Sequence, residues 1–392
     1  ERDQIGSSWT KRWDSFKLNS PTYTNLLPGE NIDSYSSKGF ISGKEFTDHL
    51  HDYARVNHLP VQQNTSVTSV NKSPLEPLFF VEVNHNGHKE TWKSKQIVIA
   101  SGGESQPKLP AFQNLIPKNI RQFHSSEYRN PAQLPSGSVL IIGSATSGVQ
   151  IAEDLRAAHR TVYLSTSAVA RVPRRYRGRD IMDWMTDLHF FEKPTSQAED
   201  FELNMKAPLM SGVGESGHTI SLQSIENMGV ILLGYLSHID QNHLTFENNL
   251  ADHIGFGDSF SAQVKGGIDQ FITATGMTVG PPENDIADLP ANLLDPKESL
   301  SHLDLEEKNI TSIIWSTGFT QDFSWINIPV LNEKGKPNHK NGITPVDGLY
   351  FMGLPWQRNL KSSLIYGTAG DAEEVTQAIM KFHFDKSEAI RI

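Results

Sequence analysis

The stretch of sequence that decides the fold is Val139-Leu-Ile-Ile-Gly-Ser-Ala-Thr-Ser-Gly-Val-Gln-Ile-Ala-Glu-Asp-Leu155. Its first four residues, 139–142, form an apolar run that predicts a buried strand. A turn of Gly, Ser and Ala follows, and apolar side chains then recur at helical spacing over 149–155. Strand, tight turn and helix is the arrangement whose helix N-terminus binds a pyrophosphate. A second apolar strand over 162–164 completes a βαβ unit.

The turn carries an imperfect dinucleotide-binding pattern. Gly143, Ala145 and Gly148 occupy the three positions of G-x-G-x-x-G, and Ser147 lies between the last two. Alanine stands where the backbone has to approach the pyrophosphate most closely. By itself the pattern also fits an ordinary strand-turn-helix of an α/β protein. We expect these four residues to bind the cofactor because of the signals that surround them.

The residues after the second strand select the coenzyme. A carboxylate about 20 residues after the turn would bind the ribose of NAD, but residues 165–167 are Ser-Thr-Ser. Five arginines follow between Arg171 and Arg179. A phosphate on the ribose needs cations, so the sequence favours NADP(H). The candidate phosphate ligands are Arg171, Arg174 and Arg175, with a solvated or salt-bridged loop as the alternative. Arg177 and Arg179 are expected to pair with nearby acids.

Composition excludes several classes of protein. The chain of 392 residues has room for two or three domains, and its net charge of −10 argues against nucleic-acid binding. No apolar run approaches the ~20 residues of a membrane span, so no membrane insertion is expected. The sequence has no cysteine, which excludes a thiol nucleophile, a redox dithiol and a cysteine metal site. With no disulfide to form, a cytoplasmic location is expected.

The sequence contains no motif typical of a metal site or of a serine hydrolase. The 15 histidines include no H-x-x-x-H or H-E-x-x-H spacing, so no metal site is expected. No G-x-S-x-G elbow is present either.

The remaining pattern indicates an α/β protein with parallel strands that end in glycine turns. A helix is expected over 44–58 and another over 371–384, with weaker helical patches near 183–190 and 259–275. Strands are expected over 66–70, 79–84, 91–92, 97–100, 230–236, 310–315 and 348–353. The proline-rich residues 105–137 are expected to connect two domains.

Several segments spread along the chain resemble one family. They are Gly6-Ser-Ser-Trp9 through Asn19-Ser-Pro21, Leu27-Pro-Gly29, Ala100-Ser-Gly102 with Pro107 and Pro110, His124-Ser125 with Tyr128-Arg129, the Gly143 turn, Trp315-Ser-Thr-Gly-Phe319, and Gly348-Leu-Tyr-Phe-Met-Gly353. In this order they resemble the flavin-dependent monooxygenases, one-component FAD and NADPH enzymes. The match is nearest to a bacterial flavoprotein branch of oxidoreductases.

The resemblance implies two Rossmann-like, three-layer domains, with an NADP domain inserted into a discontinuous FAD domain. The expected ranges are 1–112 and 310–392 for FAD and 113–309 for NADP. It also implies an enzyme that uses NADPH and O₂ to oxygenate a small organic substrate through a flavin hydroperoxide. The oligomeric state is left open.

Three departures from the family pattern qualify this expectation. The N-terminal strand and G-x-G-x-x-G turn that bind the FAD pyrophosphate, about 30 residues, are absent from the sequence. In that register Glu1 would be the carboxylate on the adenosine ribose. Lys118 and Ile120 replace a phenylalanine and a glycine before His124, and Ala145 is the third departure.

The resemblance assigns further residues to the cofactors. Asn19 is placed as a neutral hydrogen-bond donor that stabilises the oxygenated flavin, with a turn residue as the alternative interpretation. Packing in the core is the alternative for Trp9. Ser101, Gly102, Thr317 and Gly318 mark the two turns that cross between domains. Gly370 and Asp371, at the start of the last helix, are expected near the flavin ring, although Asp371 also fits a helix cap. The full cofactor set from the resemblance is Glu1, Trp9, Ser101, Gly102, Thr317, Gly318, Gly370 and Asp371.

Two other functions remain open. One is an FAD/NADPH reductase or oxidase that passes electrons to O₂ or to a partner without oxygenating a substrate. The other is a non-catalytic NADP-binding remnant that has lost FAD, which the absent N-terminal unit favours.

Overall fold

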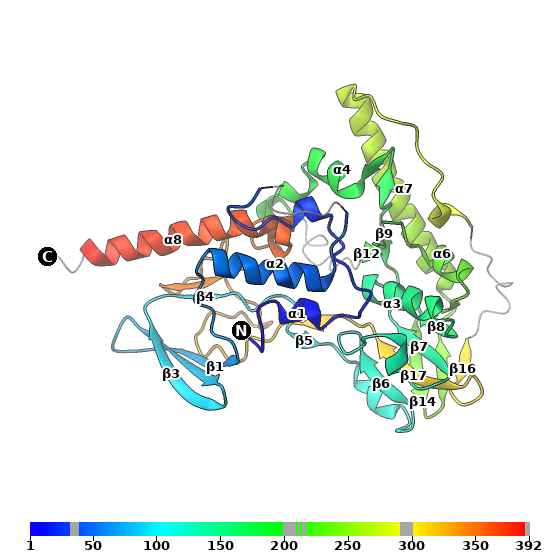
Figure 1. The fold of residues 1–392 in the computed structure, drawn as a ribbon, viewed down its shortest axis with the longest axis horizontal. Helices are drawn as coiled ribbons and strands as arrows, with labels where there is room; N and C mark the ends of the chain where they lie inside the picture. The colour runs from blue at the N-terminus through cyan, green and yellow to red at the C-terminus, as the bar shows by residue number, and fades with distance from the viewer. Residues whose placement is uncertain (32–38, 199–208, 211, 214–216, 291–300, 389–392) are drawn as a thin grey trace.

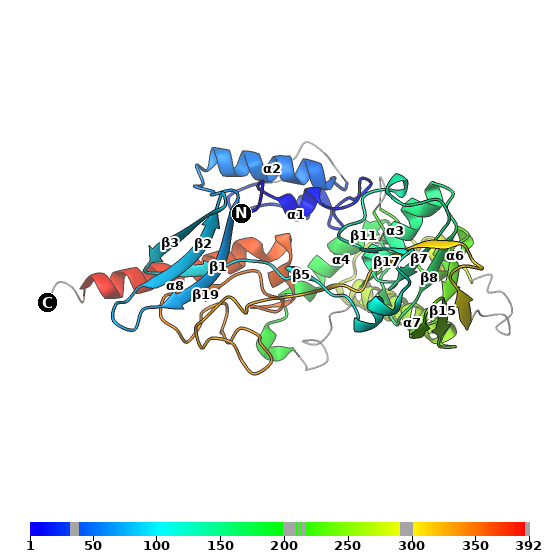
Figure 2. The same ribbon diagram turned by 90° about the horizontal axis from the view of Figure 1, so that it is seen from below.

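The computed structural model describes residues 1–31, 39–198, 209–210, 212–213, 217–290 and 301–388. The chain forms two α/β halves that lie side by side and are joined by extended segments (Figures 1 and 2). One half is built around a five-stranded parallel sheet, and the other holds the N-terminal helices, an antiparallel sheet and the C-terminal helix.

The five-stranded sheet is the predicted nucleotide-binding core. Its order is β13-β8-β7-β17-β6, and every neighbouring pair is parallel. The strands are β6 (Arg121–His124), β7 (Ser138–Ile142), β8 (Val162–Ser165), β13 (Ile231–Leu233) and β17 (Ile310–Trp315). Helix α3 (Thr146–Ala157) connects β7 to β8 and completes the expected βαβ unit.

The position of β17 corrects the expected domain boundary at residue 310. This strand lies between β7 and β6, with Ile313 opposite Leu140 on one side and Gln122 on the other. Because it is hydrogen-bonded on both edges, β17 belongs to the inserted half, and a boundary after Trp315 fits the sheet.

The two faces of this sheet are covered differently. Val139 and Ile141 pack on α3 and α6 (Leu222–Asn227), whereas Leu140 and Ile142 face the opposite side. That side is covered by an antiparallel sheet of β14 (Leu236–Asp240), β15 (His243–Phe246) and β16 (His302–Asp304). The expected three layers are therefore present in this half, with β-structure rather than helices as the third layer.

The described residues of the other half include an antiparallel sheet and a parallel strand pair. Strands β1 (Thr65–Lys72), β2 (Phe79–His85) and β3 (His88–Ser94) form an antiparallel meander, and β4 (Ile97–Ile99) pairs in parallel with β19 (Leu349–Phe351). Helices α1 (Ser7–Thr10), α2 (Gly43–Val56) and α8 (Thr368–Glu388) accompany them. The expected helices over 44–58 and 371–384 are therefore confirmed.

Two extended segments connect the halves. Strand β5 (Gln106–Pro107) pairs antiparallel with β18 (Phe319–Thr320), so the outgoing and returning chains are bonded to each other. Residues 101–102 and 317–318 border this pair, as expected for turns that cross between domains.

The N-terminal segment packs on both halves. Trp13 belongs to the apolar cluster of the inserted half, together with Val139 and Leu155, while Leu18 packs against Phe46 on α2. Residues 11–24 therefore bridge the two halves rather than belonging to the expected FAD part alone.

The remaining elements are short, apart from one long helix. The strand expected over 230–236 is divided between β13 and β14, and α7 begins nine residues earlier than the patch expected from 259. The inserted half also holds helices α4 (Ile181–Asp187) and α7 (Leu250–Thr275). Its short strands β9 (Ala170–Arg171) and β12 (Leu209–Met210) pair with each other, as do β10 (Arg175–Tyr176) and β11 (Arg179–Asp180). Short 3-10 helices span Thr22–Thr24, Ala111–Leu115, Pro131–Gln133, Phe190–Glu192, Thr195–Gln197, Ile286–Asp288, Leu360–Ser363 and Ile365–Gly367.

Candidate functional site

The turn between β7 and α3 uses its two glycines for close packing. Gly143 has φ of +107°, and a Cβ there would lie 2.5 Å from the carbonyl oxygen of Ser316 at the end of β17. A Cβ on Gly148 would lie 1.9 Å from the carbonyl oxygen of Gly143. The first glycine therefore permits the tight turn and the last lets the helix approach the strand.

The N-terminus of α3 opens at this turn without a side-chain cap. Ala145 is the N-cap residue, in extended conformation, and its side chain makes no capping hydrogen bond. The half-buried Ser147 follows in that turn. The first amides of a helix have no partner within it and form a positive end that suits an anion.

Two hydrogen bonds join the turn to the end of β8. The backbone N–H of Ser167 donates to Ser144 Oγ at 3.0 Å, and the N–H of Gly143 donates to the carbonyl of Ser165 at 3.0 Å. The corner where a dinucleotide ribose is recognised in this kind of unit is therefore lined by serine rather than by a carboxylate.

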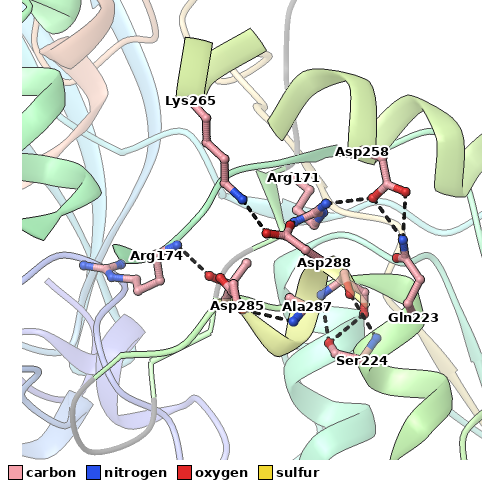
Figure 3. Close-up of polar contacts among 11 residues, drawn as sticks. Arg171, Arg174, Gln223, Ser224, Asp258, Lys265, Asp285, Ala287 and Asp288 are labelled. Atoms are coloured by element: carbon pink, nitrogen blue, oxygen red, sulfur yellow. Dashed lines mark hydrogen bonds and ion pairs between the residues drawn. The ribbon is translucent and has the colours of Figure 1, made fainter. Parts of the chain in front are cut away.

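Arg171 is enclosed by acidic residues. Its Nη1 donates to Asp288 Oδ1 at 2.9 Å and its Nη2 to Asp258 Oδ1 at 2.7 Å, and the side chain is 3% exposed (Figure 3). Asp288 also bonds Lys265, and Asp258 accepts two bonds from Gln223. Burial raises the pKa of Asp288, but Lys265 and Arg171 more than offset this, so the pKa is lowered overall.

Arg174 is equally buried and makes a two-point ion pair. Its Nε and Nη2 donate to the two oxygens of Asp180, each at 2.9 Å, and its guanidinium lies 4.3 Å from the ring centroid of Phe40. Nη1 donates to the backbone carbonyl of Asn19 at 2.6 Å.

These contacts correct the expected phosphate-binding role of Arg171 and Arg174. A buried guanidinium that carboxylates already neutralise has little attraction left for a phosphate. Arg175 is exposed, and its Nη2 donates to the Gly178 carbonyl at 2.8 Å, so it is the candidate of the three that solvent reaches. Arg177 pairs with Asp269 and Arg179 with Asp187, which confirms the prediction made for both.

Asn19 lies where the N-terminal segment meets α3. Its Oδ1 accepts a hydrogen bond from Gln150 Nε2 at 2.9 Å. The residue is exposed, and its Nδ2 has no protein partner among the described residues. The amide therefore presents two N–H groups outward.

The second crossing turn is fixed by a buried histidine. His124 Nε2 donates to the Gly318 carbonyl at 2.9 Å, and the Ser126 N–H donates to His124 Nδ1. Burial lowers the pKa of His124, which favours the neutral ring. Thr317 Oγ1 donates to the carbonyl of Lys108 on the neighbouring crossing segment. These bonds hold the two halves in register.

The first crossing turn follows β4 at Ser101 and Gly102. Both residues are exposed, and Gly102 has φ of +78°. Its carbonyl accepts from Gln321 Nε2 at 3.5 Å on the returning segment.

The first turn of α8 holds a buried carboxylate. Asp371 is 1% exposed, and its Oδ1 accepts from Arg358 Nε at 2.7 Å and from Ser362 Oγ at 3.2 Å. Its Oδ2 is buried and has no hydrogen-bond partner among the residues that the structure describes. A Cβ on Gly370 would lie 2.3 Å from Arg358 Nη2, so this glycine makes room for the arginine. Asp371 is thus paired on one oxygen and open on the other.

Two further predicted residues lie near the N-terminus. Glu1 is exposed, and its Oε1 accepts from the backbone N–H of Arg2. Trp9 is half-buried and meets Phe46 edge-on at 5.1 Å between ring centroids. Its packing supports the alternative of a core residue.

No cluster of three or more His, Cys, Asp or Glu side chains within the described ranges has the arrangement of a metal site. In the same part of the chain, no helix combines the length and apolar character needed to cross a membrane.

Known proteins share this organisation. The profile of the pyridine nucleotide-disulphide oxidoreductase family matches residues 6–185. An uncharacterized CzcO-like oxidoreductase from Geobacillus kaustophilus is 31% identical over 383 residues, which cover 97% of this chain and 90% of that protein. A flavin-containing monooxygenase from Stenotrophomonas maltophilia superposes with a TM-score of 0.59 at 16% identity, covering 95% of this chain and 87% of the other. OTEMO in complex with FAD and NADP superposes with a TM-score of 0.54 at 15% identity, over 99% and 81% of the two chains.

The chain belongs to the flavin-dependent monooxygenase and oxidoreductase family. Its fold is the two-domain α/β fold with Rossmann-like domains, as the sequence predicts, and the family is one of enzymes. FAD and NADP, the two expected cofactors, agree with membership of this family.

Sequence reasoning missed two residues of the site. Gln150 and Ser144 were not singled out, although both are buried polar side chains beside the glycine turn. The signal for Gln150 was available, because an amide between Val149 and Ile151 interrupts an apolar run and needs a hydrogen-bond partner.

Proposed function

We propose that the protein is an NADPH- and O₂-dependent flavoprotein monooxygenase that oxygenates a small organic molecule. In balanced form, NADPH, a proton, O₂ and the substrate yield NADP⁺, water and the oxygenated substrate. The observation that carries the proposal is the amide of Asn19, a neutral donor whose N–H groups face outward where the two halves meet.

The residues present fit both cofactors. The N-terminus of α3, with Ala145 at its N-cap, and the positive φ of Gly143 suit the NADP pyrophosphate, and the serine corner carries no carboxylate that would repel a ribose phosphate. The buried, unpartnered Oδ2 of Asp371 is an acceptor that suits a hydroxyl of FAD. When bound, the flavin supplies the hydride acceptor and the centre that reacts with O₂.

The role of Asn19 follows from its chemistry. A carboxamide donates hydrogen bonds but does not release a proton near neutral pH, so it can stabilise an oxygen-bearing group without protonating it. A carboxylic acid at this place would favour proton transfer and loss of hydrogen peroxide. A neutral donor therefore supports oxygenation over simple oxidase activity.

The proposal assigns one cofactor to each half of the chain. Residues 1–112 and the chain after Trp315 form the half that binds FAD, and the inserted half binds NADPH. Within the inserted half, the exposed Arg175 is the arginine that would bind the coenzyme phosphate. A cytoplasmic location and a small-molecule substrate belong to the same proposal. Residues 1–392 contain no cysteine, which argues against disulfide reduction by a dithiol of this chain.

The test begins with the absorption spectrum of the purified chain with FAD, before and after anaerobic NADPH. Bleaching of a flavin spectrum is the expected result. In air, NADPH consumption is then compared with hydrogen peroxide release for a panel of amines, sulfides and ketones. A substrate that lowers the peroxide yield per NADPH supports oxygenation. Quantitative peroxide with every compound would indicate the oxidase alternative, and a protein that binds NADPH but never FAD would indicate the non-catalytic one.

A further inference from the structure

The side chain of Gln150 decides which end of the Asn19 amide faces outward. A carboxamide has an acceptor oxygen and a donor nitrogen of nearly equal size, so its orientation depends on its partner. Gln150 Nε2 donates to Asn19 Oδ1 at 2.9 Å, which directs the oxygen toward α3 and the nitrogen away from it. Gln150 is 6% exposed in an otherwise apolar stretch of that helix, so its own position is fixed by packing.

The backbone of Asn19 is fixed from the same side. Arg174 Nη1 donates to the Asn19 carbonyl at 2.6 Å while its other nitrogens hold Asp180. Because the two-point pair with Asp180 fixes the guanidinium plane, the carbonyl of Asn19 meets a rigid donor. Both groups that hold Asn19 come from the inserted half, whereas Leu18 next to it packs on Phe46 of α2.

We propose that Gln150 is a positioning residue that turns the Asn19 amide nitrogen toward the reaction site, and that Arg174 fixes the backbone beneath it. This inference rests on the role of Asn19 in the proposed function. Its consequence is that the coenzyme-binding half orients a donor carried by the N-terminal segment. Contacts of Ser15 Oγ with Asp154 at 2.6 Å and of Tyr23 with Asp183 hold the same segment on that half.

The sharpest variant is Gln150→Glu. A glutamate can only accept, so it would attract Asn19 Nδ2 and turn the oxygen outward, which removes the donor without changing the shape of either side chain. Gln150→Met removes the preference for either orientation. Gln377→Glu is the matched control, because it makes the same chemical change at an exposed position on α8.

The first readout needs no cofactor. In protein labelled with ¹⁵N at asparagine, the side-chain NH₂ signal of Asn19 is identified by its loss in Asn19→Ala. We expect this signal to shift by more than its linewidth and to exchange more slowly with water in Gln150→Glu, and to stay unchanged in Gln377→Glu. An unchanged Asn19 signal in Gln150→Glu would overturn the positioning role.

The second readout uses the FAD-loaded chain with NADPH and O₂ but no substrate. We expect Gln150→Glu to raise the rate of peroxide release about ten-fold, with the rate of anaerobic flavin reduction within two-fold of the parent and the apparent KM for NADPH unchanged. If the Asn19 signal shifts but peroxide release does not, the positioning holds and the function proposed for Asn19 is wrong. The two failures are therefore distinguishable.

Discussion

Arg174 and Asp180 form a two-point ion pair in which Nε and Nη2 each donate to a carboxylate oxygen at 2.9 Å. The pair is buried, and it occupies one of the three arginines that the sequence offered as ligands of a coenzyme phosphate. An arginine-rich segment after the second strand of a βαβ unit is therefore not sufficient to locate a coenzyme phosphate, since acids such as Asp180 compete for the same cations.

Coenzyme selection is expected to depend on Arg175. Arg175→Ala should raise the apparent KM for NADPH about ten-fold and leave the KM for NADH nearly unchanged, because a charge-assisted bond to phosphate is lost. Arg177→Ala is the control, since Arg177 already pairs with Asp269. Steady-state kinetics with both coenzymes make the measurement, and an equal loss with both would contradict the assignment.

The enclosed Arg171 is expected to stabilise the fold rather than bind coenzyme. Arg171→Leu should lower the free energy of unfolding by about 3 kcal/mol, the low end for breaking a buried ion pair, because the partly exposed Asp258 and Asp288 regain water. Urea denaturation measures this. If Arg171→Leu kept the stability of the parent but raised the KM for NADPH, Arg171 would be a phosphate ligand after all.

The glycine turn provides a matched pair of stability tests. Gly148→Ala should cost about 3 kcal/mol of unfolding free energy, because the new methyl group meets the rigid carbonyl of Gly143. Gly266→Ala, at an open position of α7 with nothing within 4 Å, should add about 1 kcal/mol by raising helix propensity. Similar effects of both variants would contradict the close packing at the turn.

The α2 cap makes part of the stability depend on pH. Ser42 Oγ accepts from the Glu45 N–H, and the Ser42 N–H donates to Glu45 Oε2 at 2.7 Å. The backbone bond from Ser42 lowers the pKa of Glu45 in the folded state. Its stabilisation is therefore full above the unfolded pKa near 4.5 and is lost as the pH falls through the lower folded value.

Two variants test this cap. Ser42→Ala should cost about 1 kcal/mol at pH 7. Glu45→Gln retains an acceptor but cannot titrate, so its unfolding free energy relative to the parent should improve as the pH falls below 4.5. If the unfolding free energies of the parent and of Glu45→Gln changed in parallel with pH, the ionised Glu45 side chain would contribute nothing to stability.

Flavin binding is expected to depend on the open oxygen of Asp371. In Asp371→Asn, the amide oxygen can still accept from Arg358, but the amide NH₂ group, which is a donor, takes the place of Oδ2. A fluorescence titration should show a Kd for FAD raised about ten-fold, equivalent to one lost hydrogen bond to a charged group. An unchanged Kd would place Asp371 in a purely structural role beside Arg358.

Much of the local structure could be predicted from the sequence. The apolar run before Gly143 and the spacing after it predicted β7 and α3, and the Ser42–Glu45 spacing at the start of α2 is that of a capping box. These elements depend on side-chain periodicity and on bonds between residues a few positions apart, so they can be recognised without knowing the rest of the fold.

The place of β17 and the partners of the arginines required the tertiary structure. Ile310–Trp315 reads as a strand, but nothing in its own residues says that it lies between β6 and β7 rather than in the other half. Arg171 is 87 residues from Asp258 and 117 from Asp288, so no local pattern links them.

The sequence by itself determined the family, the βαβ unit, its glycine turn and the presence of a second α/β part, because short-range periodicity and motifs are enough to recognise them. Only the tertiary structure decided which arginines are neutralised and which end of Asn19 faces outward. Gln150 and Asn19 are 131 residues apart, and their hydrogen bond exists because chain packing brings α3 against the N-terminal segment. The ion-pair and hydrogen-bond partners of a side chain are its neighbours in space. Residues that are far apart in the sequence become such neighbours only when the chain folds.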